Sequence, residues 1–182
     1  MTRPILIVPG LHGSQAGHWQ HWWRQDHADS SIVQQADWSH PLESEWLEVA
    51  ERAIFRRPDS LVIAHSLGAI LVAKLARSRV ASCIAGALLV APADITRTSL
   101  RHHRTYEFGA MPQDRIPFPT LVVASQDDPY MPYAKLVTLA GLWGSRIHDM
   151  GHVGHINVES GFGRWTQGYA LAASILPQHQ LP

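Results

Sequence analysis

The sequence predicts an α/β fold: a three-layer sandwich in which helices cover both faces of a mostly parallel sheet of about six strands. Short apolar runs rich in β-branched residues alternate along the chain with segments of helical periodicity. Several of these runs are apolar at every position, as expected for parallel strands buried on both faces. The length of 182 residues fits a single domain over residues 1–182.

The first third of the chain contains two strand candidates and two helix candidates. Residues 5–8 are all apolar and end at a Pro-Gly pair, which is typical of a buried strand followed by a loop. Three tryptophans on one side favour a helix at residues 17–28, and residues 31–35 form a weaker strand candidate. Apolar side chains at helical spacing over residues 43–54 predict an amphipathic helix with one buried face.

The middle of the chain contains two further buried strands with a helix between them. The apolar runs at residues 61–64 and 84–91 predict the strands, and residues 67–77 predict the helix. Residues 92–119 show no steady period and contain four prolines, so a loop with at most a short helix is expected. Within it, residues 96–117 form either a short cap over the site or an ordinary surface connection.

The last third of the chain continues the alternation of strands and helices. Strands are expected at residues 120–124 and 146–150, and helices at residues 133–142 and 162–175. In a parallel sheet of this kind, ligands bind beyond the carboxyl ends of the strands. Functional motifs are therefore expected in the loops that follow strands.

Composition and charge exclude several classes of function. Lys and Arg together number 15 and Asp and Glu also number 15, so no global field would attract nucleic acid or an anionic membrane. The apolar run at residues 5–8 is too short for a signal peptide, and no transmembrane segment is expected. The single cysteine, Cys83, excludes an internal disulfide and favours a reducing compartment. A cytoplasmic location is the resulting expectation.

One segment has the form of a nucleophile elbow. The strand at residues 61–64 runs into Ser66-Leu67-Gly68 and then directly into a helix, which is the context that an elbow serine requires. Gly68 fits the usual pattern, whereas Ala64 replaces the glycine normally found two residues before the serine. The alternative is a serine that merely caps the helix. We expect Ser66 to be the nucleophile and the Leu67 backbone amide to face the reacting carbonyl.

Two aspartates follow the strand at residues 120–124. A serine hydroxyl needs a base, and the base needs a third group that orients it. Asp128 is the preferred acid because it begins an Asp-Pro-x-x-Pro loop and because Pro129 biases it toward an extended conformation. Asp127 is expected to brace the turn, and the alternative is that both are turn residues.

Two histidines lie in the glycine-rich loop after the last expected strand. The Gly-His-Ile-Asn context favours His155 as the general base, with His152 in reserve. The resulting order of serine, acid and histidine is that of α/β-hydrolases. A metal site built from these histidines and His148 is disfavoured, because the intervening glycines spoil the helix that such a site would need. We expect neither a metal nor a cofactor.

The loop after the first strand is the expected source of a second oxyanion amide. Leu11 is the first choice for this backbone donor, and His12 is the second. The spacing of Gly10 and Gly13 also resembles a phosphate-binding loop, but the Gly-Lys-Ser/Thr ending is absent. His12 and Trp38, which follows a strand candidate, are expected to bind the substrate.

Several pieces of sequence resemble a known family. They are residues 8–10, Trp38 with Pro41 and Trp46, and residues 64–68, 125–129 and 154–163 with Trp165. In these pieces the chain resembles the small serine hydrolases related to the retinoblastoma-binding serine hydrolase and its bacterial relatives. The resemblance implies a compact α/β-hydrolase fold without a large lid. It also supports Ser66, Asp128 and His155 residue by residue.

The resemblance does not extend to the retinoblastoma partner. The Leu-x-Cys-x-Glu motif is absent, since Ile84 and Ala85 follow Cys83. The predicted activity is transfer of an acyl group to water through a Ser-His-Asp triad and an acyl-enzyme, on a small ester first and on a thioester or amide second. The expected partner is therefore a small-molecule acyl substrate. Two alternatives are an acyltransferase and a catalytically weak binding protein with the same fold.

Overall fold

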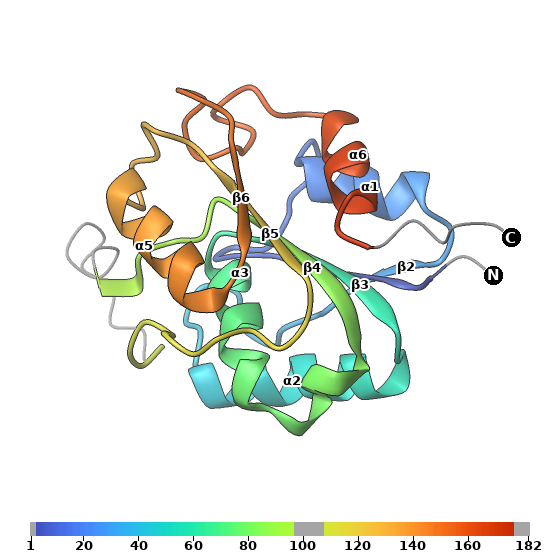
Figure 1. Cartoon of the computed structure of the whole chain (residues 1–182). Coiled ribbons are helices and arrows are strands. Elements are labelled where there is room, and N and C mark those ends of the chain that lie inside the picture. Colours follow the sequence, from blue (N-terminus) through green and yellow to red (C-terminus); the bar gives the residue numbers. More distant parts are fainter. Residues whose placement is uncertain (1–2, 97–107, 177–182) are drawn as a thin grey trace, which may run out of the picture.

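The computed structural model describes residues 3–96 and 108–176 (Figure 1). In these residues all strand pairs are parallel, and one sheet has the order β2-β1-β3-β4-β5-β6. The strands are β1 (Ile5–Val8), β2 (Ser30–Ile32), β3 (Ser60–His65), β4 (Ile84–Val90), β5 (Thr120–Ala124) and β6 (Arg146–Asp149). This arrangement confirms the predicted parallel α/β fold.

Helices cover both faces of the sheet. They are α1 (Trp19–Asp26), α2 (Glu43–Arg56), α3 (Leu67–Lys74), α5 (Tyr133–Trp143) and α6 (Gln167–Ala173), with short 3-10 helices η1 (Leu75–Arg77) and η2 (Arg79–Cys83). Helices α1 and α6 lie on one face, whereas α2, α3 and α5 lie on the other (Figure 1). Among the described residues, no helix has the length and apolar character needed to cross a membrane.

The strands alternate between two hydrophobic clusters. In β3, Val62 and Ala64 pack into the cluster under α2, α3 and α5, while Leu61 and Ile63 pack into the cluster under α1 and α6. Both faces therefore need apolar side chains, because neither face is open to water. This is the physical reason why the inner strands are largely apolar, whereas the edge strands β2 and β6 carry polar side chains.

Two predicted boundaries, the end of β2 and the start of the last helix, were wrong by three or more residues. β2 ends at Ile32, because it is an edge strand and pairs only with the four-residue β1. The helix predicted at residues 67–77 is confirmed, with its last turn, Leu75–Arg77, tightened into a 3-10 helix. The helix predicted from residue 162 begins at Gln167, because the Phe162 amide donates back to the Asn157 carbonyl in a turn.

The chain leaves β1 and β3 toward opposite faces of the sheet. These strands are neighbours, yet the loop after β1 leads to α1 and Ser66, directly after β3, leads to α3. Such a topological switch point opens a crevice at the carboxyl ends of the strands. Much of the possible cap, residues 97–107, lies outside the described residues. Phe108, in the described part of this segment, packs in the core against the Trp46 ring at 5.6 Å between centroids.

Candidate active site

Ser66 occupies a strained turn between β3 and α3. Its backbone has φ 55° and ψ −123°, a conformation that side chains rarely adopt. The Ser66 amide donates to the Val90 carbonyl at 3.0 Å, and the Ser66 carbonyl accepts from Ala69 at 3.0 Å. Hydrogen bonds to β4 and α3 thus hold the serine in an unfavourable backbone conformation, which is common where strain serves a function.

Two glycines make this turn possible. A Cβ at Gly68 would lie 2.4 Å from the carbonyl oxygens of Val8 and Pro9, so only glycine lets α3 begin against the end of β1. A Cβ at Gly10 would lie 2.8 Å from the Ser66 Cβ. The loop after β1 is therefore packed directly on the serine. Ala64, which replaces the usual first glycine, is fully buried within β3.

Ser66, His155 and Asp128 form a continuous hydrogen-bonded chain. The His155 Nε2 atom lies 2.9 Å from the Ser66 Oγ. On the other side of the ring, Nδ1 lies 2.9 and 3.0 Å from the two carboxylate oxygens of Asp128. The side chains of His155 and Asp128 are only 8% and 3% exposed. The three predicted residues, from three different loops, therefore meet at one edge of the sheet.

The two aspartates have different surroundings. Asp128 also accepts from the Tyr130 amide at 2.8 Å, and the Tyr130 ring lies 4.5 Å from the His155 ring between centroids. Asp127 does not contact the imidazole. It accepts from the Gly154 amide at 2.8 Å, and this hydrogen bond is the largest cause of the lowered pKa of Asp127. Asp127 therefore braces the loop that carries the histidine.

The histidine loop is held by two side chains that sequence reasoning missed. His65 Nε2 donates to the His155 carbonyl at 2.9 Å, and Trp19 Nε1 donates to the Ile156 carbonyl at 2.8 Å. Ile156 is fully buried with φ 50°, an outlier for a β-branched residue. His65 lies within the elbow motif and could have been noticed there. Trp19 could not, because it is 137 residues away in sequence.

A buried histidine pair lies beside the imidazole of His155. The His65 ring centroid lies 4.8 Å from that of His155 and 4.9 Å from that of His18. Burial, followed by the charge on His155, lowers the pKa of His18 to about 4 and the pKa of His65 well below its usual value. Both side chains are therefore neutral near pH 7. His152, the reserve base, is exposed.

The two loops expected to supply oxyanion amides pack against each other at Ser66. Leu67 is the first residue of α3, where amides have no partner within the helix. Its nitrogen would lie 3.2 Å from a Cβ at Gly10, next to Leu11 in the β1 loop. The His12 amide, the second choice, is already engaged, since it donates to the Trp38 carbonyl at 2.9 Å. This leaves Leu11 as the preferred donor of the sequence-based prediction, which stays a prediction.

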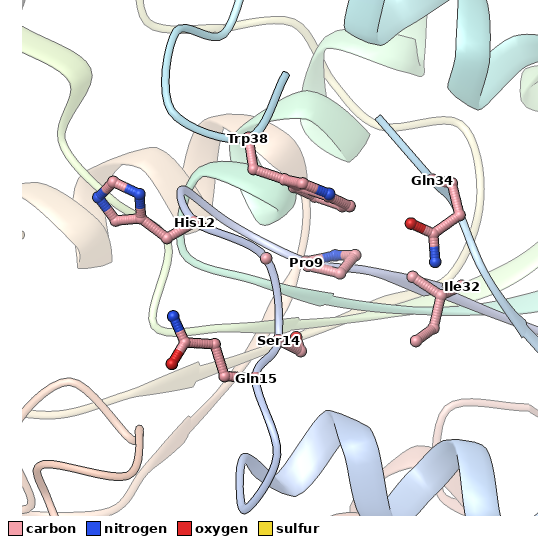
Figure 2. Close-up of a pocket in the computed structure, with 8 residues that line it drawn as sticks. Pro9, His12, Ser14, Gln15, Ile32, Gln34 and Trp38 are labelled. Carbon is pink, nitrogen blue, oxygen red and sulfur yellow. The ribbon is translucent and has the colours of Figure 1, made fainter. Parts of the chain in front are cut away.

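The residues expected to bind substrate line a pocket beside this loop. It has a volume of about 150 Å³, and its walls are Pro9, His12, Gly13, Ser14, Gln15, Ile32, Gln34 and Trp38 (Figure 2). His12 is exposed and has φ 67°, and Trp38 is partly buried. Within residues 3–96 and 108–176, no group of three His, Cys, Asp or Glu side chains is placed to hold a metal ion.

The chain is similar to known hydrolases in sequence and in fold. The family model described as Serine hydrolase matches residues 5–174. YdeN of Bacillus subtilis (strain 168), named as a candidate hydrolase, is 22% identical over 89% of this chain and 90% of its own length. A YdeN-like protein from Pectobacterium atrosepticum has a solved structure with a TM-score of 0.81 and 29% identity, covering 96% of this chain and 90% of that one.

A more distant structure shares the fold. MGS-M2, an α/β-hydrolase enzyme from a deep-sea metagenome, has a TM-score of 0.69 and 12% identity, covering 100% of this chain and 91% of that one. These likenesses agree with a compact α/β-hydrolase fold, and no large lid is indicated in the described residues. Because the family model matches nearly the whole chain, this protein belongs to the Serine hydrolase family.

Proposed function

We propose that this hydrolase cleaves small carboxylic esters with Ser66 as nucleophile, His155 as general base and Asp128 as the acid that orients the histidine. The observation that carries the proposal is the hydrogen-bonded chain from the Ser66 hydroxyl through the imidazole to the buried carboxylate. Esters come first because their alcohol leaves more readily than an amine. Thioesters and amides are the next substrates to test.

The first half of the reaction forms an acyl-enzyme. The Ser66 Oγ attacks the ester carbonyl while its proton passes to Nε2 of His155, and Asp128 stabilises the imidazolium. The amides of Leu11 and Leu67 donate to the oxyanion of the tetrahedral intermediate. When the carbon–oxygen bond to the alcohol breaks, the Nε2 proton moves to the departing oxygen. The alcohol leaves, and the acyl group stays on the serine.

The second half of the reaction releases the acid. Water attacks the acyl carbonyl and gives one proton to Nε2 of His155, and the same two amides hold the second oxyanion. The bond to the Ser66 Oγ then breaks, and the serine recovers its proton from Nε2. The net change is ester and water to acid and alcohol. No cofactor is needed for any step.

The deciding test is the Ser66→Ala variant. Alanine keeps the Cβ, so the strain of the turn and the fold should not change, but the nucleophilic oxygen is lost. Labelling by a fluorophosphonate should disappear, and kcat for chromogenic esters should fall by about 10⁴-fold or more. Ser82→Ala is the matched control, since Ser82 is exposed and donates only to the Arg79 carbonyl. Normal labelling of Ser66→Ala would refute the assignment.

The same assays separate this activity from its two alternatives. A binding protein without turnover would neither label nor release product. An acyltransferase would pass the acyl group to an added alcohol or amine faster than to water. Analysis of the products with and without an acceptor distinguishes transfer from hydrolysis.

A further inference from the structure

We infer that the pocket between the carboxyl ends of β1 and β2 binds the acyl part of the substrate and selects a compact, uncharged acyl group up to the size of a phenyl ring. We call it the β1–β2 pocket, and its residues are the eight drawn in Figure 2. This inference rests on the proposed esterase activity. It adds which end of the ester is recognised and by what chemistry.

The wall of the pocket is preformed and shared with the oxyanion loop. Ser14 Oγ donates to the Gln20 Oε1 at 2.5 Å, and the Gln20 amide donates to the carbonyls of Val8 at 3.3 Å and Ile63 at 3.1 Å. Gln20 is fully buried, so these bonds tie the loop to both β1 and β3. A group in the pocket is therefore held at a set distance from the Leu11 amide, which suits a catalytic site.

The order of the strands assigns the pocket to the acyl side. Ser66 follows β3, the β1–β2 pocket lies toward one edge of the sheet, and Asp128 and His155 follow β5 and β6 toward the other edge. The alcohol must leave on the side of His155, because the imidazole gives it a proton. The acyl group, which stays on Ser66, then faces the opposite side. That side holds the β1–β2 pocket.

The size and chemistry of the pocket define the acyl group. A cavity of about 150 Å³ is large enough for a benzene ring. In Figure 2 the Trp38 indole lies above Pro9, with Ile32 and Gln34 to one side of them. None of its eight residues is Asp, Glu, Lys or Arg, so a charged acyl group would lose its hydration without gaining a permanent partner charge.

The Trp38 ring is fixed before substrate arrives. Its indole packs edge-on against Trp46 at 5.5 Å between centroids. A Cβ at Gly13 would lie 3.4 Å from the ring, so the loop approaches its face closely. A fixed aromatic face binds a planar ring with little loss of side-chain entropy. Trp38 is therefore the residue on which selectivity should depend.

The test compares 4-nitrophenyl phenylacetate with 4-nitrophenyl acetate, which share a leaving group and differ only in the acyl part. The wild-type protein should prefer the phenylacetate. Trp38→Ala should lower the ratio of the two kcat/KM values about tenfold or more, as loss of an apolar pocket contact does. Gln34→Trp, at an exposed position, should lower the same ratio by filling the pocket. The charged 4-nitrophenyl succinate monoester should be a poor substrate for all three proteins.

Controls separate the possible failures. Trp22→Ala removes a tryptophan that packs under Arg164, away from the pocket, and should leave the ratio unchanged. If Trp38→Ala and Gln34→Trp both keep the wild-type ratio, the acyl assignment is wrong. It is also wrong if the variants discriminate between benzyl acetate and ethyl acetate instead, because the pocket would then bind the alcohol. If the wild type hydrolyses no ester, the proposed function fails and the inference falls with it.

Discussion

Asp127 and Asp128 are adjacent in sequence, yet their carboxylates serve different neighbours. Asp128 contacts the imidazole of His155, whereas Asp127 holds the Gly154 amide of the same loop. The Ser125 hydroxyl also donates to Asp127 at 2.7 Å. The two side chains can therefore be separated by experiment, because one contacts the imidazole and the other holds the loop that carries it.

We predict that Asp128→Asn lowers kcat by about 10⁴-fold, since an amide cannot hold the histidine tautomer that accepts the serine proton. Asp127→Asn should lower kcat far less and act mainly on the thermal midpoint, because it weakens the hydrogen bond that the Gly154 amide donates to residue 127. Steady-state kinetics and thermal unfolding of both variants check this. If Asp127→Asn is inactive while Asp128→Asn remains active, Asp127 is the acid that orients the histidine and Asp128 braces the loop.

We predict that His65 is a positioning residue for the base, because it donates to the His155 carbonyl and its ring lies beside the imidazole. His65→Ala should lower kcat by up to about 10²-fold with little change in KM, since small displacements of a catalytic group cost that much. His65→Gln, whose amide can donate to the same carbonyl, should recover part of the loss. If both variants merely lower the thermal midpoint and keep kcat, the role of His65 is structural only.

At the scale of elements, α3 and the loop after β1 are packed so closely that the site depends on glycine. Helix α3 is buried at Leu67–Ala73, and its first turn rests on the end of β1. Helix α5 differs, because one of its faces is exposed to solvent and Gly141 has no atom within 4 Å of an added Cβ. The same substitution should therefore have opposite effects in the two helices.

Gly68→Ala should destabilise the protein by about 1–3 kcal/mol, because the new Cβ would overlap the carbonyls of Val8 and Pro9. It should also lower kcat, since α3 must move and carries the Leu67 amide with it. Gly141→Ala should stabilise the protein by up to about 1 kcal/mol through helix propensity alone. Urea denaturation of both variants measures these changes. Equal effects of the two would mean that the close contact at Gly68 relaxes at no cost.

At the scale of the whole molecule, strain is concentrated at one edge of the sheet. Five non-glycine residues of the described chain have a positive φ. Four of them, His12, Ser66, Ala91 and Ile156, follow strands β1, β3, β4 and β6 at the carboxyl edge. Strained backbone persists only where its surroundings over-determine it. The rest of the fold therefore stabilises a site that is locally unfavourable.

Burying neutral histidines makes the stability of the whole fold depend on pH. His18 has a pKa of about 4 in the folded protein and an ordinary value of 6.5, and burial is the main cause. Between these values the unfolded chain binds a proton that the folded protein does not. Stability should therefore be complete above about pH 6.5 and fall as pH decreases toward 4, by on the order of 3 kcal/mol from His18. His65 acts in the same direction.

Thermal midpoints measured from pH 7.5 to pH 4.5 check this prediction. His18→Asn keeps a side-chain acceptor for the Gln20 amide at the start of α1 but does not titrate, so it should flatten the curve. His40→Asn, at a side chain that is 82% exposed, is the control. Asp residues with lowered pKa values contribute below their ordinary value of 3.8, outside this window. A wild-type thermal midpoint that stays constant as pH decreases from 7.5 to 4.5 would contradict a role of the buried histidines in pH-dependent stability.

The amino-acid sequence alone determined the features that depend on near neighbours. Apolar runs of four to seven residues specify buried strands, because both faces of the sheet are covered. A serine between a strand and a helix, followed by Gly68, specifies the tight turn at Ser66. The order of the motifs and their places after strands were also readable. Boundaries of the edge strand and of the last helix were not, because pairing and turn hydrogen bonds decide where those elements stop.

Only the tertiary structure decided which side chains meet. The contact of His155 with Ser66 joins residues 89 apart, and that of Trp19 with Ile156 joins residues 137 apart. The backbone amide of His12 is engaged because it donates a hydrogen bond to the carbonyl of Trp38, which lies on another loop. Such contacts follow from the order of the strands, which brings distant loops to one edge of the sheet. Local patterns carry no record of that order, because the energy that sets it comes from packing the whole core.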